Sequence, residues 1–176
     1  LVRQPFIAAT FAPAPPGRAV RALAIAGNRL YMVDPYLFDP NAGIIVADIS
    51  RRTEVSILGS VAVSGVPLDL VLGGRYLFAA VGYAGMVVVD VSDPAAPRVV
   101  GQFNPDAGPD DVGRWDTRRV ALSDTVAWLV TSDARLVGVD VSNPVLPREL
   151  VVLDLEGNPT DIVVADGRLY VAMNAF

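Results

Sequence analysis

The sequence predicts an all-β protein built from repeated four-stranded antiparallel units. Three observations support this fold class: a strand-like motif recurs along the chain, turn residues separate short apolar runs, and no apolar pattern keeps the 3.6-residue spacing of a helix. The chain has 176 residues, of which 15 are Gly and 14 are Pro, and these interrupt nearly every helix-sized window.

The recurring motif is an apolar strand that ends in aspartate. It reads IIVADIS at 44–50, MVVVDVS at 86–92 and LVGVDVS at 136–142, so the aspartates at positions 48, 90 and 140 lie 42 and 50 residues apart. In a second register, PLDLV at 67–71 matches PTDIV at 159–163, which lies 92 residues later. These intervals are typical of a four-stranded propeller blade with loops of variable length, so we predict a β-propeller with antiparallel blades.

The second unit shows how the strands of one blade are expected to follow one another. Its four strands are expected at 68–72, 76–81, 86–91 and 98–103. Gly-rich turns join the first three, and Ser92-Asp93-Pro94 favours the reversal into the fourth. The third strand is almost wholly apolar, which indicates that both of its faces are covered by neighbouring blades.

Three full units and two partial ones are expected along the chain. The full units are expected at 16–61, 62–105 and 106–155, with two strands of a further blade at 156–176. Residues 1–12 look like the last strand of a preceding blade. They would either complete a fourth blade that lacks its third strand or belong to a longer protein. We expect the second, because three and a half units would make a very small ring.

Residues 86–97 resemble the repeat of the LVIVD family of β-propellers, in which a strand of the type Leu-Val-Ile-Val-Asp-Val runs into a Ser-Asp-Pro turn. The first unit departs from that pattern, because Ser50-Arg51-Arg52 replaces the turn and Ala22 stands where the first strand would begin with Asp. The resemblance implies an extracytoplasmic module, which would be periplasmic, secreted or on the cell surface. It implies no catalytic residue, since the family motif is structural.

The composition argues against an enzyme. The chain has no Cys and no His, and all 14 basic residues are Arg, so the commonest nucleophiles, general bases and soft metal ligands are missing. We therefore expect no cofactor. A net charge of −5 with scattered Arg argues against nucleic-acid binding. The longest uncharged stretches have 14 residues, which is too short for a membrane-spanning helix.

The first functional hypothesis is a non-catalytic scaffold or protein-interaction module. In a propeller, the loops that enter each blade share one face with the loops between its second and third strands, and the long loops at 34–43 and 104–117 both belong to this face. Tyr36, Phe38 and Trp115 in these loops would contact a protein partner or another subunit. Alternatively, they pack against neighbouring loops of a solvated insertion.

The second hypothesis is a ligand-binding or ion-binding propeller with its site at the mouth of the central channel. Asp69 and Asp161 begin first strands, which line the channel in propellers, and Arg118 and Arg119 stand near the equivalent point of the third unit. These groups could hold a polar ligand, or hydrolyse one with Asp as the base. Alternatively, they pair with one another and order the ring. The acidic loop at 104–116 could hold Ca²⁺ but lacks EF-hand spacing, so a metal site stays open.

Overall fold

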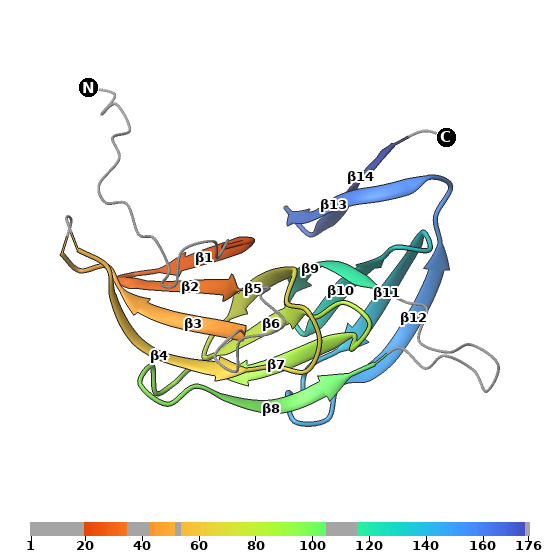
Figure 1. Ribbon diagram of the computed structural model, residues 1–176. Coiled ribbons are helices and arrows are strands. Elements are labelled where there is room, and N and C mark those ends of the chain that lie inside the picture. The colour runs from red at the N-terminus through yellow and green to blue at the C-terminus, as the bar shows by residue number, and fades with distance from the viewer. Residues whose placement is uncertain (1–19, 35–42, 52–53, 105–115, 175–176) are drawn as a thin grey trace, which may run out of the picture.

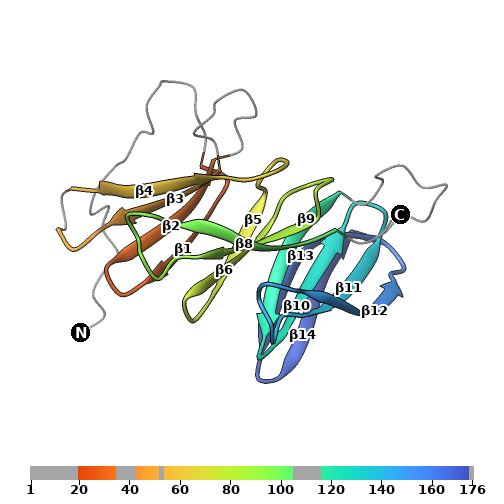
Figure 2. The same ribbon diagram turned by 90° about the horizontal axis from the view of Figure 1, so that it is seen from below.

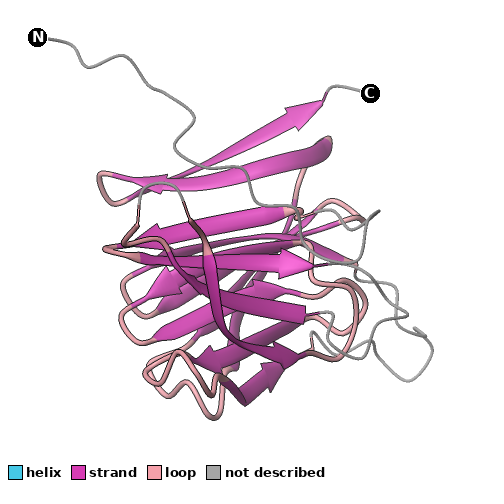
Figure 3. Ribbon diagram, turned by 60° about the vertical axis from the view of Figure 1, so that its left-hand side comes forward, coloured by secondary structure: helices cyan, strands magenta, loops and turns pink. Residues whose placement is uncertain are grey.

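The computed structural model describes residues 20–34, 43–51, 54–104 and 116–174. These residues form three four-stranded antiparallel sheets and one two-stranded sheet, and within each sheet the strands neighbour one another in chain order (Figure 1). The described part of the chain contains strands, turns and loops only (Figure 3). The prediction of an all-β fold with four-stranded antiparallel blades is confirmed.

Each sheet is one blade, numbered here from the N-terminus. The first blade contains β1 (Ala22–Ala26), β2 (Arg29–Asp34), β3 (Gly43–Asp48) and β4 (Ser56–Ala62). The second contains β5 (Asp69–Gly73), β6 (Tyr76–Ala80), β7 (Met86–Asp90) and β8 (Arg98–Phe103). The third contains β9 (Thr117–Ser123), β10 (Val126–Thr131), β11 (Arg135–Asp140) and β12 (Arg148–Asp154). The fourth contains β13 (Asn158–Ala165) and β14 (Arg168–Asn174).

The strands of the second blade begin and end within about one residue of the sequence prediction. A two-residue turn joins the first two strands of each of the four blades, and it begins with a residue in the left-handed region. That residue is Gly27 (φ 57°), Gly74 (φ 61°), Asp124 (φ 49°) or Asp166 (φ 50°). Gly and Asp are the types that accept this conformation, which is why the turns could be recognised from the sequence.

The hydrophobic core lies between the blades. One cluster joins the first and second blades and contains Tyr31 and Leu77, and another joins the second and third blades and contains Phe78 and Leu129. A third cluster joins the third and fourth blades around Val130. All five residues of β7 are buried, because that strand is covered on both faces. This confirms the prediction that the apolar third strand of the second blade is covered on both faces.

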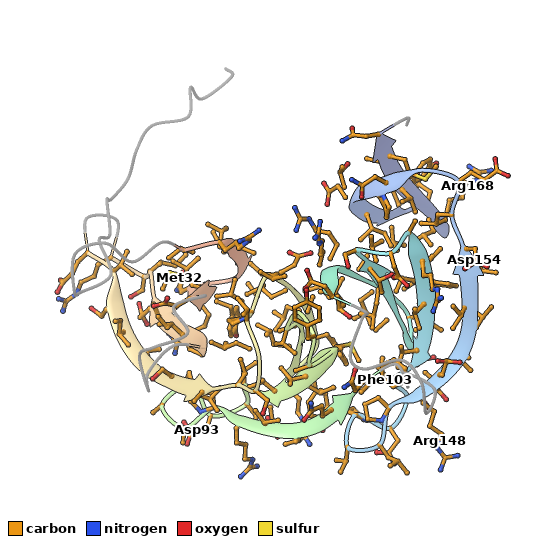
Figure 4. All side chains as sticks on the ribbon, turned by 45° about the vertical axis from the view of Figure 1, so that its right-hand side comes forward. Met32, Asp93, Phe103, Arg148, Asp154 and Arg168 are labelled. Atoms are coloured by element: carbon orange, nitrogen blue, oxygen red, sulfur yellow. The ribbon has the colours of Figure 1, made fainter. Side chains whose placement is uncertain are left out.

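The blades follow one another around an arc. Strands β1, β5, β9 and β13 lie on its inner side, and β4, β8 and β12 lie on its outer side (Figure 1). Seen from below, the three four-stranded sheets are separate layers that succeed one another (Figure 2). The side chains of Asp93 and Arg148 lie on the outer side, away from the inner strands (Figure 4). The inner strands therefore surround the position of the propeller axis.

The recurring aspartates cap the turn after each third strand, as predicted. The backbone N–H of Ser50 donates to Asp48 at 2.7 Å, that of Ser92 to Asp90 at 2.9 Å, and that of Ser142 to Asp140 at 2.8 Å. These hydrogen bonds from the serine two residues later are the main reason that the pKa of each of the three carboxyls lies below its usual value. Their common task is structural.

We expect the protein to lose stability as the pH falls below about 3.8, the usual value for an aspartate. Because the three capping carboxyls have lowered pKa values in the folded protein, the unfolded chain takes up their protons first, and acid then favours unfolding. Burial raises the pKa of Asp69, so that single group works in the opposite direction. Urea unfolding midpoints measured between about pH 6 and pH 3 should decrease, and Asp90→Ala should flatten the decrease. A constant midpoint would contradict the capping role.

No helix in the described part of the chain is long and apolar enough to cross a membrane. The predicted last strand of a preceding blade, residues 1–12, lies outside the described residues.

Candidate functional site

A cavity of about 490 Å³ lies where the inner strands of the four blades converge. Every blade contributes to its wall. The lining residues are Arg21 from the first blade, Val66, Leu68, Gly82 and Tyr83 from the second, Asp116, Arg118 and Arg119 from the third, and Asn158, Pro159 and Thr160 from the fourth. The cavity lies by the inner strands, which is the side of the blades where the sequence analysis placed one possible site.

Strand pairing explains why these residues meet. Counted back from the turn that ends each inner strand, four of them occupy the same register position: Arg21, Leu68, Arg118 and Thr160. Because the blades are arranged around one axis, equivalent positions of the inner strands face the same central space (Figure 1). One equivalent position from each blade thus contributes to the wall, with Arg in the first and third blades, Leu in the second and Thr in the fourth.

The cavity carries more positive than negative charge. Arg118 Nε lies 3.2 Å from Asp116 Oδ2, and the Arg118 side chain remains 48% exposed. The Arg119 side chain makes two contacts, with its Nη1 donating to the carbonyl of Arg118 at 3.0 Å and its Nε 3.6 Å from Asp161 Oδ1. Within the described part of the chain Arg21 makes no ion pair, and it is exposed. Three guanidinium groups and one carboxylate thus line the cavity, and two of the three are paired, Arg118 with Asp116 and Arg119 with Asp161, which lies outside the lining.

Asp69 and Asp161 stand next to the cavity but do not line it. The backbone N–H of Val120 in β9 donates to Asp69 at 3.0 Å, so this carboxylate links the second blade to the third. Burial raises the pKa of Asp69, and the hydrogen bonds from Val120 and Leu70 partly offset that effect. Asp161 accepts the N–H of Ile162 at 2.9 Å and pairs with Arg119, and it is largely exposed.

Two backbone hydrogen bonds join the second and third blades beside the cavity. Gly82, in the loop between β6 and β7, exchanges two backbone hydrogen bonds with Thr117 at the start of β9, at 3.0 and 3.2 Å. Gly82 has a φ of 64°, and a Cβ there would lie 3.2 Å from Asp116 Oδ1, so glycine suits this close approach. The position of Asp116, and with it that of Arg118, depends on this contact.

The structure brings Arg118 and Arg119 to the cavity, together with residues that sequence reasoning missed. Arg21, Tyr83 and Asn158 are the main additions. Arg21 had a detectable signal, because it directly precedes Ala22, the first-unit equivalent of Asp69. Tyr83 lies in the loop between β6 and β7, and Asn158 is the first residue of β13. Neither belongs to a repeated pattern, so no sequence signal indicated them.

Tyr36, Phe38 and Trp115, predicted to contact a partner, lie outside the described residues, as does most of the acidic loop proposed for calcium. Among the residues that the structure does describe, no three carboxylates gather as a metal site.

Solved structures with similar folds are numerous. A Lactobacillus plantarum protein matches with a TM-score of 0.72 and 18% identity over 88% of this chain and 48% of its own. A periplasmic gluconolactonase from Pseudomonas aeruginosa matches with a TM-score of 0.71 and 14% sequence identity. The match covers 89% of this chain and 47% of the gluconolactonase. The Cps50 (Swd1) β-propeller domain of Myceliophteria thermophila matches with a TM-score of 0.68 and 16% sequence identity. The match covers 89% of this chain and 51% of that domain. At these identities the likeness concerns the fold alone, and this chain spans about half the length of each structure.

The family comparison matches two of the blades. The LVIVD repeat matches residues 64–105, which contain β5 to β8, and residues 115–154, which contain β9 to β12. No curated protein sequence matches the chain. The second and third blades of this β-propeller fold are therefore LVIVD repeats, as the resemblance in the sequence predicted.

Proposed function

We propose that this propeller is a non-catalytic binding module whose channel-mouth cavity holds a small ligand with a carboxylate or phosphate group. The observation that carries the proposal is the excess of guanidinium groups around one cavity, Arg21, Arg118 and Arg119 against Asp116. Arginine offers a planar fork of N–H donors that matches carboxylate and phosphate oxygens, and hydrogen bonds between charged groups are among the strongest in proteins.

The rest of the wall suits a ligand that also has an uncharged part. Asn158 and Thr160 supply amide and hydroxyl groups, while Leu68 and Pro159 supply apolar surface. Tyr83 adds an exposed aromatic ring. A pocket with mixed polar and apolar walls and a few charged groups is typical of small-molecule sites.

The proposal of a non-catalytic role rests on the available chemistry. The chain has no Cys and no His, and its basic residues are all Arg. The one carboxylate that lines the cavity, Asp116, is paired with Arg118. The gluconolactonase neighbour shares the fold, and a shared fold does not transfer a reaction.

Replacing Arg21 with alanine is expected to weaken anion binding about tenfold, since one charge-assisted hydrogen bond is lost. Titration calorimetry with phosphate, citrate, a sugar phosphate and the matching neutral sugar would test this. The charged compounds should bind and the neutral sugar should not. Arg148→Ala is the control, because Arg148 lies on the outer side of the third blade (Figure 4). Absence of binding throughout the panel, or equal losses in both variants, would overturn the proposal.

The protein-contact hypothesis stays a prediction beside this one. It concerns the same face of the propeller, because Tyr83 lies in the loop between the second and third strands of its blade, where Tyr36 and Phe38 lie in theirs. Replacing Tyr36, Phe38 and Trp115 together with alanine should abolish partner capture and leave the unfolding midpoint unchanged. Unchanged capture would contradict it.

A further inference from the structure

The loop between β6 and β7 carries Tyr83 and is fixed by hydrogen bonds on both sides of that residue. The backbone N–H of Gly85 donates to the carbonyl of Gly82 at 3.0 Å, which closes the turn around Tyr83. The side chain of Gln102 in β8 donates to the carbonyl of Ala84 at 3.2 Å. The backbone before and after Tyr83 is therefore held within its own blade.

Two contacts with other segments hold the same loop. Gly82 exchanges its two backbone hydrogen bonds with Thr117 of the third blade. Gly65, in the segment that enters the second blade, lies so close that a Cβ there would stand 2.8 Å from the Cβ of Ala84. A loop fixed in this way presents Tyr83 in one place. Binding against the ring then needs little further ordering of the protein.

The ring of Tyr83 serves the cavity and not the core. Tyr83 is 65% exposed, lines the cavity beside Leu68 and Arg118, and belongs to none of the hydrophobic clusters formed by the described residues. The repeat does not require an aromatic residue in this loop, because the corresponding loop of the third blade, at 132–134, reads Ser-Asp-Ala. The aromatic ring is thus an addition to the blade at the wall of the cavity.

Polar groups of the same wall suit a ligand with several hydroxyl groups. Asn158 supplies amide donors and an amide acceptor. Thr160 Oγ1 donates to the carbonyl of Ala172 at 3.2 Å, which leaves its oxygen able to accept a hydrogen bond. Asp116 engages Arg118 through Nε, which leaves the Nη donors of that guanidinium for a ligand. Donors and acceptors therefore lie in the same cavity as the aromatic ring.

From this arrangement we infer that the ligand of the cavity is a sugar that carries a phosphate or carboxylate group. The inference rests on the proposed function, in which the arginines hold the anionic group. A sugar ring has an apolar C–H face and a hydroxylated edge. Tyr83 stacks on the apolar face, and Asn158 and Thr160 bind hydroxyl groups at the edge. Tyr83 is then the residue that favours sugar anions over anions without a ring.

A planar aromatic anion is the alternative ligand with a ring. It would stack on Tyr83 equally well, but it has no hydroxyl groups for Asn158 and Thr160. Its binding would displace water from these two side chains without replacing their hydrogen bonds, and such a displacement lowers affinity. The polar part of the wall therefore favours the sugar.

Titration calorimetry on the unaltered protein tests the class of ligand with matched pairs, glucose 6-phosphate against inorganic phosphate and glucuronate against acetate. Each sugar anion should bind about tenfold more tightly than its partner without a ring. Phenyl phosphate should bind more weakly than glucose 6-phosphate. Equal binding of phosphate and glucose 6-phosphate, or phenyl phosphate binding as tightly as the sugar phosphate, would overturn the inference and leave the proposed function standing. Absence of binding by all of these anions would overturn both.

Variants of Tyr83 test its role through the ratio of the affinities for glucose 6-phosphate and inorganic phosphate. Tyr83→Ala should reduce this ratio from about ten to about one, whereas Tyr83→Phe should keep it because the flat ring remains. Tyr170→Ala is the matched control, since Tyr170 on β14 is 50% exposed and does not line the cavity. Binding of inorganic phosphate shows that each variant is folded. A ratio near ten in Tyr83→Ala, or an equal fall in Tyr170→Ala, would overturn the inference.

Discussion

Replacing Phe78 with alanine is expected to lower the free energy of unfolding by about 3–5 kcal/mol. Phe78 is buried between the second and third blades, in one cluster with Met86, Leu129 and Val137. The loss has two parts, the transfer of the ring out of the core and the cavity left behind, because two hydrogen-bonded sheets cannot close over the space. Urea unfolding followed by far-UV circular dichroism would measure it.

Tyr83→Ala is the control for this variant. Tyr83 belongs to the same blade and is 65% exposed, so its removal should change the unfolding free energy by less than about 0.5 kcal/mol. If Phe78→Ala cost no more than Tyr83→Ala, the main core of the protein would not lie between the blades.

The second large effect is expected from Gly101→Ala, with a loss of about 1–3 kcal/mol. Gly101 lies on the outer strand β8, and a Cβ there would stand 2.1 Å from the carbonyl oxygen of Pro144, in the turn between β11 and β12 of the next blade. Gly101 is held by strand pairing with Val88. Pro144 lies in a turn closed by the hydrogen bond from the Leu146 N–H to the Asn143 carbonyl, so moving either backbone segment would disturb its hydrogen bonds. Thermal and urea unfolding should both show the loss.

Gly59 makes the equivalent approach one blade earlier, with a Cβ position 2.7 Å from the carbonyl oxygens of Pro94 and Ala95. Gly59→Ala should therefore destabilise the protein in the same direction and by less. Val99→Ala, a shortening on the same strand as Gly101, is the control and should cost under about 1 kcal/mol because Val99 is partly exposed. A Gly101→Ala protein as stable as the unaltered one would contradict the close packing of turn against strand.

In the third blade, the glycine lies on the third strand and not on the outer strand. At the register position of Gly59 and Gly101 it has Val151, and the residue opposite on the third strand is Gly138 instead of valine. A Cβ on Gly138 would stand 2.9 Å from Val151 and 3.0 Å from Trp128. The glycine and the larger side chain have exchanged places, so the outer strand of this blade has no glycine gap to receive a following turn.

Much of the fold followed from the sequence because its signals are local. The turn pairs such as Gly74-Arg75 and Asp124-Thr125 need a backbone conformation that few residue types accept, so composition alone revealed them. The capping role of Asp90 could be inferred in the same way, since its partner is the backbone two residues later. Even the burial of β7 on both faces was readable from an unbroken apolar run.

The candidate site was predicted only in part because its members are far apart in the chain. Arg118 and Arg119 were found through the repeat, but Arg21 and Asn158 join them only when the four inner strands surround one axis. Asp69 carries the clearest repeat signal at the channel mouth, yet its carboxylate receives the N–H of Val120 from the next blade. A repeated pattern identifies equivalent positions and does not say which neighbour satisfies each side chain.

By itself, the sequence determined the strands, the turns, the period of the repeat and the lack of common catalytic groups, since each depends on residue type or on neighbours within a few positions. Tertiary structure alone decided which arginines share a cavity and that Tyr83 lines it with them. These features arise where blades meet. Such contacts depend on how whole sheets are placed, and no local pattern encodes that placement.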